Sequence, residues 1–280
     1  MMNKYLLQKH LKGFLIHAFL ILVAVTCIFP LYWMLRSSLM TQATVFTNQS
    51  FLPTEWHFHN YYTAFVDGKF GRYLLNSVIY TVSVVFGILV ISSLAAFAFS
   101  RLRFPGKKFF FYMFVAAMMI PLPGSFVPLY VLMTKLNLIN TAQGYIFCMI
   151  NVGLSLSILL LKTFFDKMPT DLEDAARIDG CSKLGIWRHV ALPLARPALA
   201  VIVIFNSLNV WNEYILAMLL LNDKSLMPLQ RGIMVFQGAH SVDYPILMAG
   251  LTIAAAPIIV IYLLMQKHII KGLSSGAVVG

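Results

Sequence analysis

The chain has 280 residues, of which 60% are hydrophobic and 11% are charged, and its formal net charge is +11. Soluble globular domains carry roughly 45 to 50% apolar and about 25% charged residues, so this chain lacks the polar surface that a soluble monomer needs. Its basic residues lie between apolar runs, which argues against a nucleic-acid-binding domain. We therefore expect an all-α integral membrane protein.

Six apolar runs follow one another along the chain, each long enough for the roughly 20 residues that cross the hydrocarbon core. We expect transmembrane helices near residues 14–35, 73–99, 109–133, 142–162, 198–221 and 244–266. The first run follows three lysines, as in a signal peptide. Its length of about 22 residues and its lack of a small-residue cleavage site indicate a retained anchor instead.

The distribution of Lys and Arg predicts the orientation of these spans. Fifteen of the 21 lie at the two termini and in the loops after the second and fourth runs, and six lie on the opposite side. Cytoplasmic loops are enriched in Lys and Arg, so both termini should be cytoplasmic. The sequence thus predicts a multi-pass protein of a plasma (inner) membrane.

The third run is interrupted in its outer half by residues that break helices. They are Pro121, Pro123, Gly124 and Pro128. Proline removes a backbone donor and clashes with the preceding turn. Broken helices beside a cavity act as gates in transporters, but the pattern favours the alternative, a simple kink.

The loop over 163–197, between the fourth and fifth runs, is too charged for the bilayer. Thr170 and Glu173 have the spacing of a capping box, and acidic residues fill the first turn. Gly180 suits the left-handed conformation that ends many helices. We expect a short helix between a start signal at Thr170 and a stop signal at Gly180.

A second short helix is expected over 182–190, before Pro193 and Pro197. Ala175 and Ala176 on the first helix present almost no side chain, so that helix could seat deeply in a groove of another protein. The alternative is a capped helix that rests on the lipid headgroups. Five acidic residues in the loop argue mildly against an anionic lipid surface.

The fifth run carries a polar stripe. Asn206, Asn209 and Glu213 fall at i, i+3 and i+7, so on a continuous helix they would share one face and point toward protein or water rather than lipid. The stripe either lines a translocation path or holds helices together. The candidate path residues are Asn206, Asn209, Trp211, Asn212, Glu213 and Tyr214.

No motif for catalysis is present. The chain has no Gly-rich phosphate loop ending in Lys-Ser/Thr and no zinc-protease or serine-hydrolase pattern. Its three cysteines have no CxxC spacing and its seven histidines are scattered, so we expect neither an enzyme nor a resident metal or cofactor. From the residues alone, the Gly-rich tail over 268–280 is expected to be disordered.

The loop over 163–197 resembles the signature loop of binding-protein-dependent ABC importer permeases, in which Glu-Ala-Ala is followed at fixed spacing by Gly and by Ile-x-Leu-Pro. Here the loop reads Asp174-Ala175-Ala176, then Gly180, then Val190-Ala191-Leu192-Pro193, with Asp in place of Glu and Val in place of Ile. Further strings, including 98–106, 211–214 and the tail 272–280, are similar to the smaller permease of maltose-type sugar importers.

This resemblance implies a type I ABC importer permease with a single domain over 1–280, located in a bacterial or archaeal plasma membrane. It implies as partners a second, homologous permease, two ATP-binding subunits that hold ATP and Mg²⁺, and an extracytoplasmic solute-binding protein. The residues that the resemblance assigns to ATPase coupling are Glu173, Asp174, Ala175, Ala176, Asp179, Gly180, Leu192 and Pro193. Those assigned to an ATPase-contacting tail are Gly272, Gly276 and Gly280.

The carbohydrate branch of this family implies a sugar, oligosaccharide or glycoside as substrate, and the sequence does not say which. The alternative from another class is a stand-alone secondary transporter or channel for a small polar solute. That reading would need an ion-coupling or filter set within the membrane, and Glu213 is the only acidic residue inside a predicted span.

Overall fold

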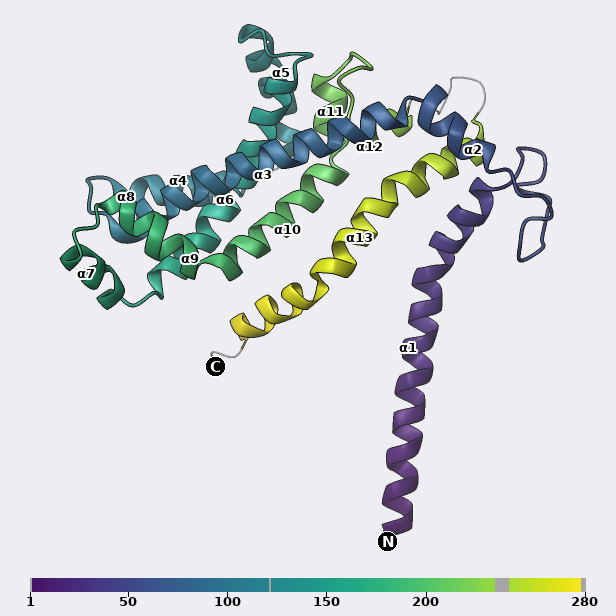
Figure 1. Ribbon diagram of the computed structural model, residues 1–280, viewed down its shortest axis with the longest axis horizontal. Coiled ribbons are helices and arrows are strands. Elements are labelled where there is room, and N and C mark those ends of the chain that lie inside the picture. The colour runs from purple at the N-terminus through teal and green to yellow at the C-terminus, as the bar shows by residue number, and fades with distance from the viewer. Residues whose placement is uncertain (1, 121, 235–241, 278–280) are drawn as a thin grey trace. The chain divides into compact units, whose positions relative to one another are not determined.

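The computed structural model describes residues 2–120, 122–234 and 242–277, and all of the regular elements within these ranges are helical (Figure 1). This confirms the predicted all-α class. The helices are α1 Met2–Ser38, α2 His59–Tyr62, α3 Phe70–Arg101, α4 Lys107–Ala117, α5 Leu122–Lys135, α6 Ala142–Asp166, α7 Asp171–Ile178, α8 Lys183–Ile186, α9 Leu192–Leu194, α10 Arg196–Asn212, α11 Ile215–Leu220, α12 Leu229–Ile233 and α13 Tyr244–Ala277. Thr63–Asp67 and Trp187–Ala191 form π-helical turns.

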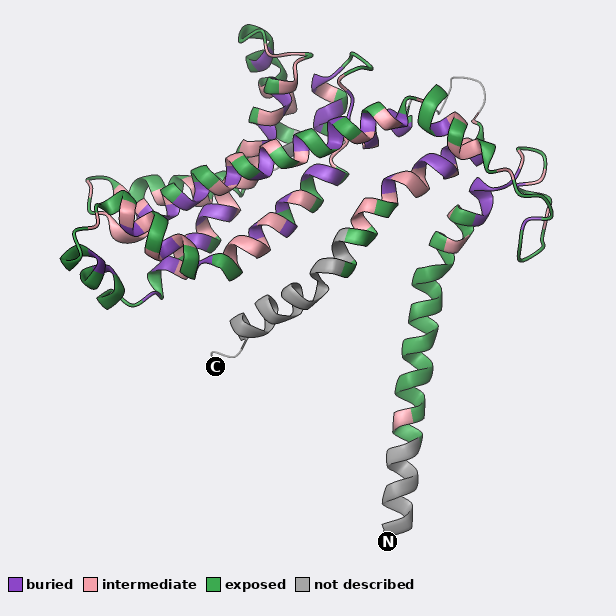
Figure 2. Ribbon diagram, in the orientation of Figure 1, coloured by how far each residue is buried: buried purple, intermediate pink, exposed green. Residues whose placement is uncertain are grey.

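Three helical segments in the described part are long and apolar enough to cross a membrane: Leu11–Ser38, Phe70–Arg101 and Ala142–Asp166. They coincide with the first, second and fourth predicted spans. The first segment has none of its most apolar stretch buried within the chain, as the exposed colouring along α1 shows (Figure 2). The other three spans and the cytoplasmic position of the termini stay predictions.

The third predicted span is broken rather than merely kinked. Helix α4 ends at Ala117, a turn covers 118–120, and α5 begins at Leu122. Pro121 lies outside the described residues. Pro128 lies within α5, and Gly124 in the same helix is exposed.

The prediction of one continuous helix over 198–221 is wrong. Helix α10 ends at Asn212, and Glu213 has an extended backbone with ψ 127°. The Glu213 carboxylate accepts hydrogen bonds from the backbone N–H groups of Leu216 at 2.6 Å and Ala217 at 3.0 Å. It therefore caps the start of α11 and stabilises the break, because the first N–H groups of a helix have no partner within the helix.

Contacts divide the chain into two compact units, Met1–Phe70 with Val235–Ala256 and Gly71–Met234 with Pro257–Gly280. In the first, the Asn60 amide donates to the carbonyl of Ser38 at the end of α1, at 2.9 Å, and to that of Met40 just beyond it, at 2.8 Å. The Gln42 side chain accepts the backbone N–H of Tyr244 at 2.9 Å, which ties this segment to the start of α13. Whether residues 1–280 form one permease domain stays a prediction.

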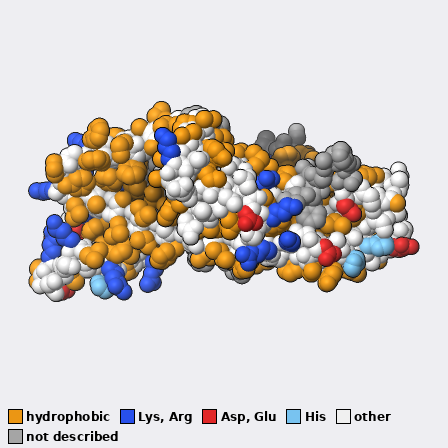
Figure 3. All heavy atoms as spheres, turned by 90° about the horizontal axis from the view of Figure 1, so that it is seen from above, with side chains coloured by type: hydrophobic (Ala, Val, Ile, Leu, Met, Phe, Trp, Pro, Cys, Tyr) orange, Lys and Arg blue, Asp and Glu red, His pale blue; other side chains and the backbone are white. Residues whose placement is uncertain are grey.

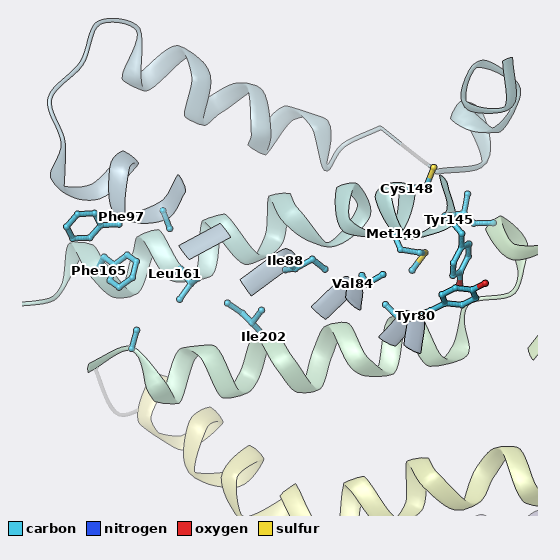
Figure 4. Close-up of a cluster of buried hydrophobic side chains, with 14 of the residues drawn as sticks. Tyr80, Val84, Ile88, Phe97, Tyr145, Cys148, Met149, Leu161, Phe165 and Ile202 are labelled. Carbon is cyan, nitrogen blue, oxygen red and sulfur yellow. The ribbon is translucent and has the colours of Figure 1, made fainter. Parts of the chain in front are cut away.

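The core of the second unit lies between α3, α6 and α10. Figure 4 shows side chains of these helices pointing toward one another, with Ile88 of α3 and Ile202 of α10 among them. Small residues allow this close packing. A Cβ on Gly153 of α6 would collide with Ile88 and with the Asn206 side chain, and a Cβ on Gly87 of α3 would lie 2.5 Å from Ile150.

Two sets of side-chain hydrogen bonds tie the loop after α11 to neighbouring helices. Near the start of α3, the Asn76 amide donates to the carbonyls of Ser225 at 2.8 Å and Met227 at 2.9 Å. Before α6, the Asn140 side-chain oxygen accepts the backbone N–H groups of Asn222 at 2.9 Å and Asp223 at 2.8 Å. These contacts fix the loop against the ends of α3 and α6.

Candidate functional site

The loop between α6 and α10 contains a helix whose end matches the sequence prediction. Helix α7 stops before Gly180, which has φ +82° and accepts the left-handed conformation that a Cβ would disfavour. The Gly180 N–H donates to the carbonyl of Arg177 at 3.0 Å, and the Cys181 N–H donates to that of Ala176 at 2.9 Å. These two bonds form a Schellman motif, which satisfies the last carbonyls of the helix.

The predicted capping box at the start of α7 is wrong. Thr170 has helical backbone angles and its side chain makes no capping hydrogen bond. The Glu173 carboxylate instead turns into the protein, where one oxygen lies 2.6 Å from Nε of Arg101. The two side chains are only 4% and 11% exposed. Burying a carboxylate without a cationic partner costs more free energy than leaving a helix start without a side-chain cap. The ion pair with Arg101 therefore determines the conformation of the Glu173 side chain.

Arg101 also binds the end of a third element. Its Nη2 donates to the carbonyls of Phe165 at 2.6 Å and Met168 at 2.5 Å, at the end of α6 and just beyond it. Carbonyls at the end of a helix have no partner within the helix, and a guanidinium can bind several acceptors at once because its donors are fixed in a plane. Arg101, the last residue of α3, thus joins α3, α6 and α7, and we call this group the Arg101 clasp.

The opposite face of α7 is open. Glu173 and Ala176 are buried, while Asp174, Ala175, Asp179 and Gly180 are exposed. Two apolar side chains on this open face, Leu172 and Ile178, are 43% and 87% exposed. The Asp174 carboxylate pairs with Arg177 at 2.7 Å, and both side chains remain 59% exposed.

The second predicted short helix is confirmed as α8 and the π-helical turn Trp187–Ala191. Ser182 starts it, since the Ser182 hydroxyl accepts the Gly185 N–H at 3.1 Å. The segment Lys183–Leu194 then meets α10 at a bend of 77°. Leu192 is half-buried and Pro193 exposed at this bend, so the loop leaves the long axis of α10 abruptly.

The predicted path residues do not form one stripe. Asn206 is buried and its amide donates to the Ser157 hydroxyl on α6 at 3.2 Å, which supports the helix-joining interpretation for this residue. Asn209 and Asn212 are exposed on α10, and Trp211 is buried.

The last two path residues lie at the break that separates α10 from α11. Glu213 and Tyr214 are half-buried there. The Glu213 carboxylate also accepts a hydrogen bond from the Tyr145 hydroxyl on α6 at 3.3 Å. The structure therefore separates Asn206, which joins helices, from the four residues 209 and 212–214 that retain some exposure.

The predicted ATPase-contacting tail falls largely beyond the described side chains. Gly272 and Gly276 lie within α13, which continues to Ala277, and Gly280 lies outside the described residues. The helical backbone differs from the disorder expected from the residues alone.

Sequence reasoning missed three structural residues: Arg101, Asn140 and Ser157. Arg101 was interpreted as an orientation signal and as part of the family string 98–106, with no partner predicted for its side chain. Asn140 and Ser157 are isolated polar residues beside an apolar run, with no motif that marks their partners.

The fold and the loop together define an integral membrane permease of the ABC importer kind, and the comparison with known families agrees. Residues 61–275 match the family described as binding-protein-dependent transport system inner membrane component. This match covers more than half of the chain, so the chain belongs to that family.

Several characterised or named relatives align with nearly the whole chain. The trehalose/maltose transport system permease protein MalG of Thermococcus litoralis is 33% identical, covering 98% of this chain and 99% of the relative. The diacetylchitobiose uptake system permease protein NgcG of Streptomyces coelicolor is 32% identical, with 93% and 87% covered. A chain from the crystal structure of a bacterial ABC transporter involved in the import of the acidic polysaccharide alginate has a TM-score of 0.82 and 25% identity, with 92% of this chain and 96% of that chain covered.

Proposed function

We propose that this chain is the membrane-spanning permease subunit of an ATP-driven importer for a sugar, oligosaccharide or glycoside. The relatives named above for trehalose/maltose and diacetylchitobiose uptake support a carbohydrate substrate. The observation that carries the proposal is the Arg101 clasp, which anchors one face of α7 and leaves Leu172, Ala175 and Ile178 open for a partner.

In this proposal α7 is the element that receives movement from a cytosolic ATP-binding subunit. A helix with a small residue at its centre and apolar residues on both sides suits a groove on another protein. Arg101 would pass a displacement of α7 to the ends of both α3 and α6, because it contacts all three elements. ATP and Mg²⁺ would bind only to the two ATP-binding subunits.

The translocation path would form between this chain and a second, homologous permease, with an extracytoplasmic binding protein delivering the sugar. Asn209 and Asn212 are exposed on α10 and offer amides for sugar hydroxyls or for the partner. The breaks at Glu213 and between α4 and α5 would supply the gates. The six-span arrangement with cytoplasmic termini in a plasma (inner) membrane belongs to this proposal.

The test compares Ala175→Glu with Thr134→Glu, which changes another exposed helical position, on α5. Each tagged chain is purified from native membranes in mild detergent, its co-purifying proteins are identified, and sugar-stimulated ATP hydrolysis is measured. We expect Ala175→Glu to lose the ATP-binding subunit and the ATPase activity while keeping the second permease. Thr134→Glu should keep all partners. A chain that purifies alone and supports solute flux when reconstituted alone would refute the proposal.

A further inference from the structure

A hollow of about 560 Å³ lies between the end of α3, the start of α4, and helices α7 and α8. Its wall is rich in basic residues: Arg101, Arg103, Lys107, Arg177 and Lys183. Figure 3 shows Lys and Arg side chains gathered near α7 and α8, at the left of the view, beside broad apolar surface. Glu173 and Asp174 of the signature loop also contribute to the wall, but the sequence analysis assigned no ligand to this place.

The positive charge of this hollow is only partly neutralised. Its two carboxylates, Glu173 and Asp174, are already paired with Arg101 at 2.6 Å and Arg177 at 2.7 Å. Arg103, Lys107 and Lys183 form no ion pair within the described part of the chain. Three cations therefore line the hollow without an ion pair to any described residue.

Lys107 lies close to several of the other cations. Its ammonium group donates to the carbonyls of Ser100 at 3.1 Å and Leu102 at 3.0 Å, which carry no full charge. Burial lowers the pKa of Lys107, and the nearby cations of Lys162, Arg101 and Arg103 lower it further, against the opposing effect of Asp166. A bound anion would relieve this repulsion.

A second hollow, of about 440 Å³, adjoins the first and shares Leu102, Arg103 and Lys107 with it. Its remaining wall includes the aromatic rings of Phe104 and Phe109. Helix α4 starts beside it at Lys107, and no side chain caps its first N–H groups. Uncapped N–H groups at a helix start favour a phosphate, and an apolar wall favours hydrocarbon.

We propose that these adjoining hollows bind an anionic phospholipid, with the phosphate among Arg103, Lys107 and Lys183 and an acyl chain along Phe104 and Phe109. The phosphate chemistry alone would also fit a free phosphate ester. The apolar second hollow favours the lipid, because a soluble phosphate ester has no acyl chain to place there. The end of α3 beside the hollow is predicted to be cytoplasmic, and anionic headgroups on the cytoplasmic side of a membrane attract basic residues.

The experiment counts bound lipids on the full chain in neutral detergent by native mass spectrometry, during titration with phosphatidylglycerol or phosphatidylcholine. Arg103→Gln with Lys183→Gln should weaken phosphatidylglycerol binding about twenty-five-fold, because each basic residue near an anionic headgroup contributes about fivefold. Arg103→Lys with Lys183→Arg keeps both charges and should retain most of the binding. The matched control is Lys135→Gln with Lys224→Gln, which removes two charges from exposed positions away from the hollow.

Specific binding of phosphatidylglycerol that the control retains and the Gln pair loses would support the proposal. Equal losses in the control and the Gln pair would overturn it, since general surface charge would then explain the binding. Millimolar glycerol 3-phosphate or inorganic phosphate serves as the competitor. If either displaces the lipid fully, the site takes free phosphate and the lipid assignment fails. None of these readouts depends on the importer function.

Discussion

Replacing Arg101 with Ala should release α7 from the ends of α3 and α6. Removing one partner of a buried ion pair costs about 3 to 5 kcal/mol. The lower end applies here, because the second Glu173 oxygen lies 3.6 Å from Arg177, which remains as a weaker, exposed partner. A loss of about 3 kcal/mol corresponds to about hundredfold faster exchange of amides that open locally. Hydrogen–deuterium exchange of peptides covering 171–178, in detergent, measures this directly.

The control for this experiment is Asp174→Asn. Asp174 and Arg177 are both 59% exposed, and surface pairs of this kind contribute about 0.3 to 0.5 kcal/mol, so exchange should change by about twofold or less. Glu173→Gln keeps the shape of the side chain and should fall between the two. Unchanged exchange over 171–178 in a folded Arg101→Ala protein would refute the clasp as the anchor of α7.

Three further changes test the helix core and the break, by thermal unfolding in detergent. Gly153→Ala should lower the free energy of unfolding by about 1 to 3 kcal/mol through overpacking against α10. Gly13→Ala, with no atom within 4 Å of its added Cβ, should be neutral or stabilising by up to about 1 kcal/mol, because Ala favours a helix over Gly. Asn206→Leu should cost about 0.6 kcal/mol by removing an interhelical hydrogen bond, and the exposed Asn209→Leu should cost less. Glu213→Ala should cost about 1 kcal/mol by uncapping α11, and Glu213→Gln, which keeps one acceptor oxygen, should cost less. Equal effects within any of these pairs would contradict the assigned contacts.

The end of α7 and the start of α8 were predictable from the sequence, because the residues that determine them lie within a few positions of one another. Gly180 ends α7 and Ser182 begins α8 through backbone geometry that neighbouring residues impose. The failure of the capping box has the opposite cause. Glu173 has the right spacing to Thr170, but its partner Arg101 lies on a helix far away in the sequence, and only the tertiary fold reveals it.

The membrane spans show the same limit. Apolar residues predominate on both sides of Glu213, so an average over the fifth run predicts one continuous helix. The break depends on a single carboxylate that turns back to two N–H groups, a contact that carries no hydropathy signal. The stripe of Asn206, Asn209 and Glu213 was therefore predicted from a periodicity that does not continue through the break.

Asn140 illustrates how narrowly a loop position can restrict the choice of amino acid. Its backbone lies in the left-handed region at φ +57°, and its side-chain oxygen accepts two N–H groups from the loop after α11. Gly would tolerate the backbone but lacks the acceptor, and Ser or Thr would be strained. Asp would meet both requirements, yet it would add a negative charge beside Asp223. Although position 140 is exposed, selection for folded protein after saturation mutagenesis there should recover Asn, with Asp as the least harmful replacement.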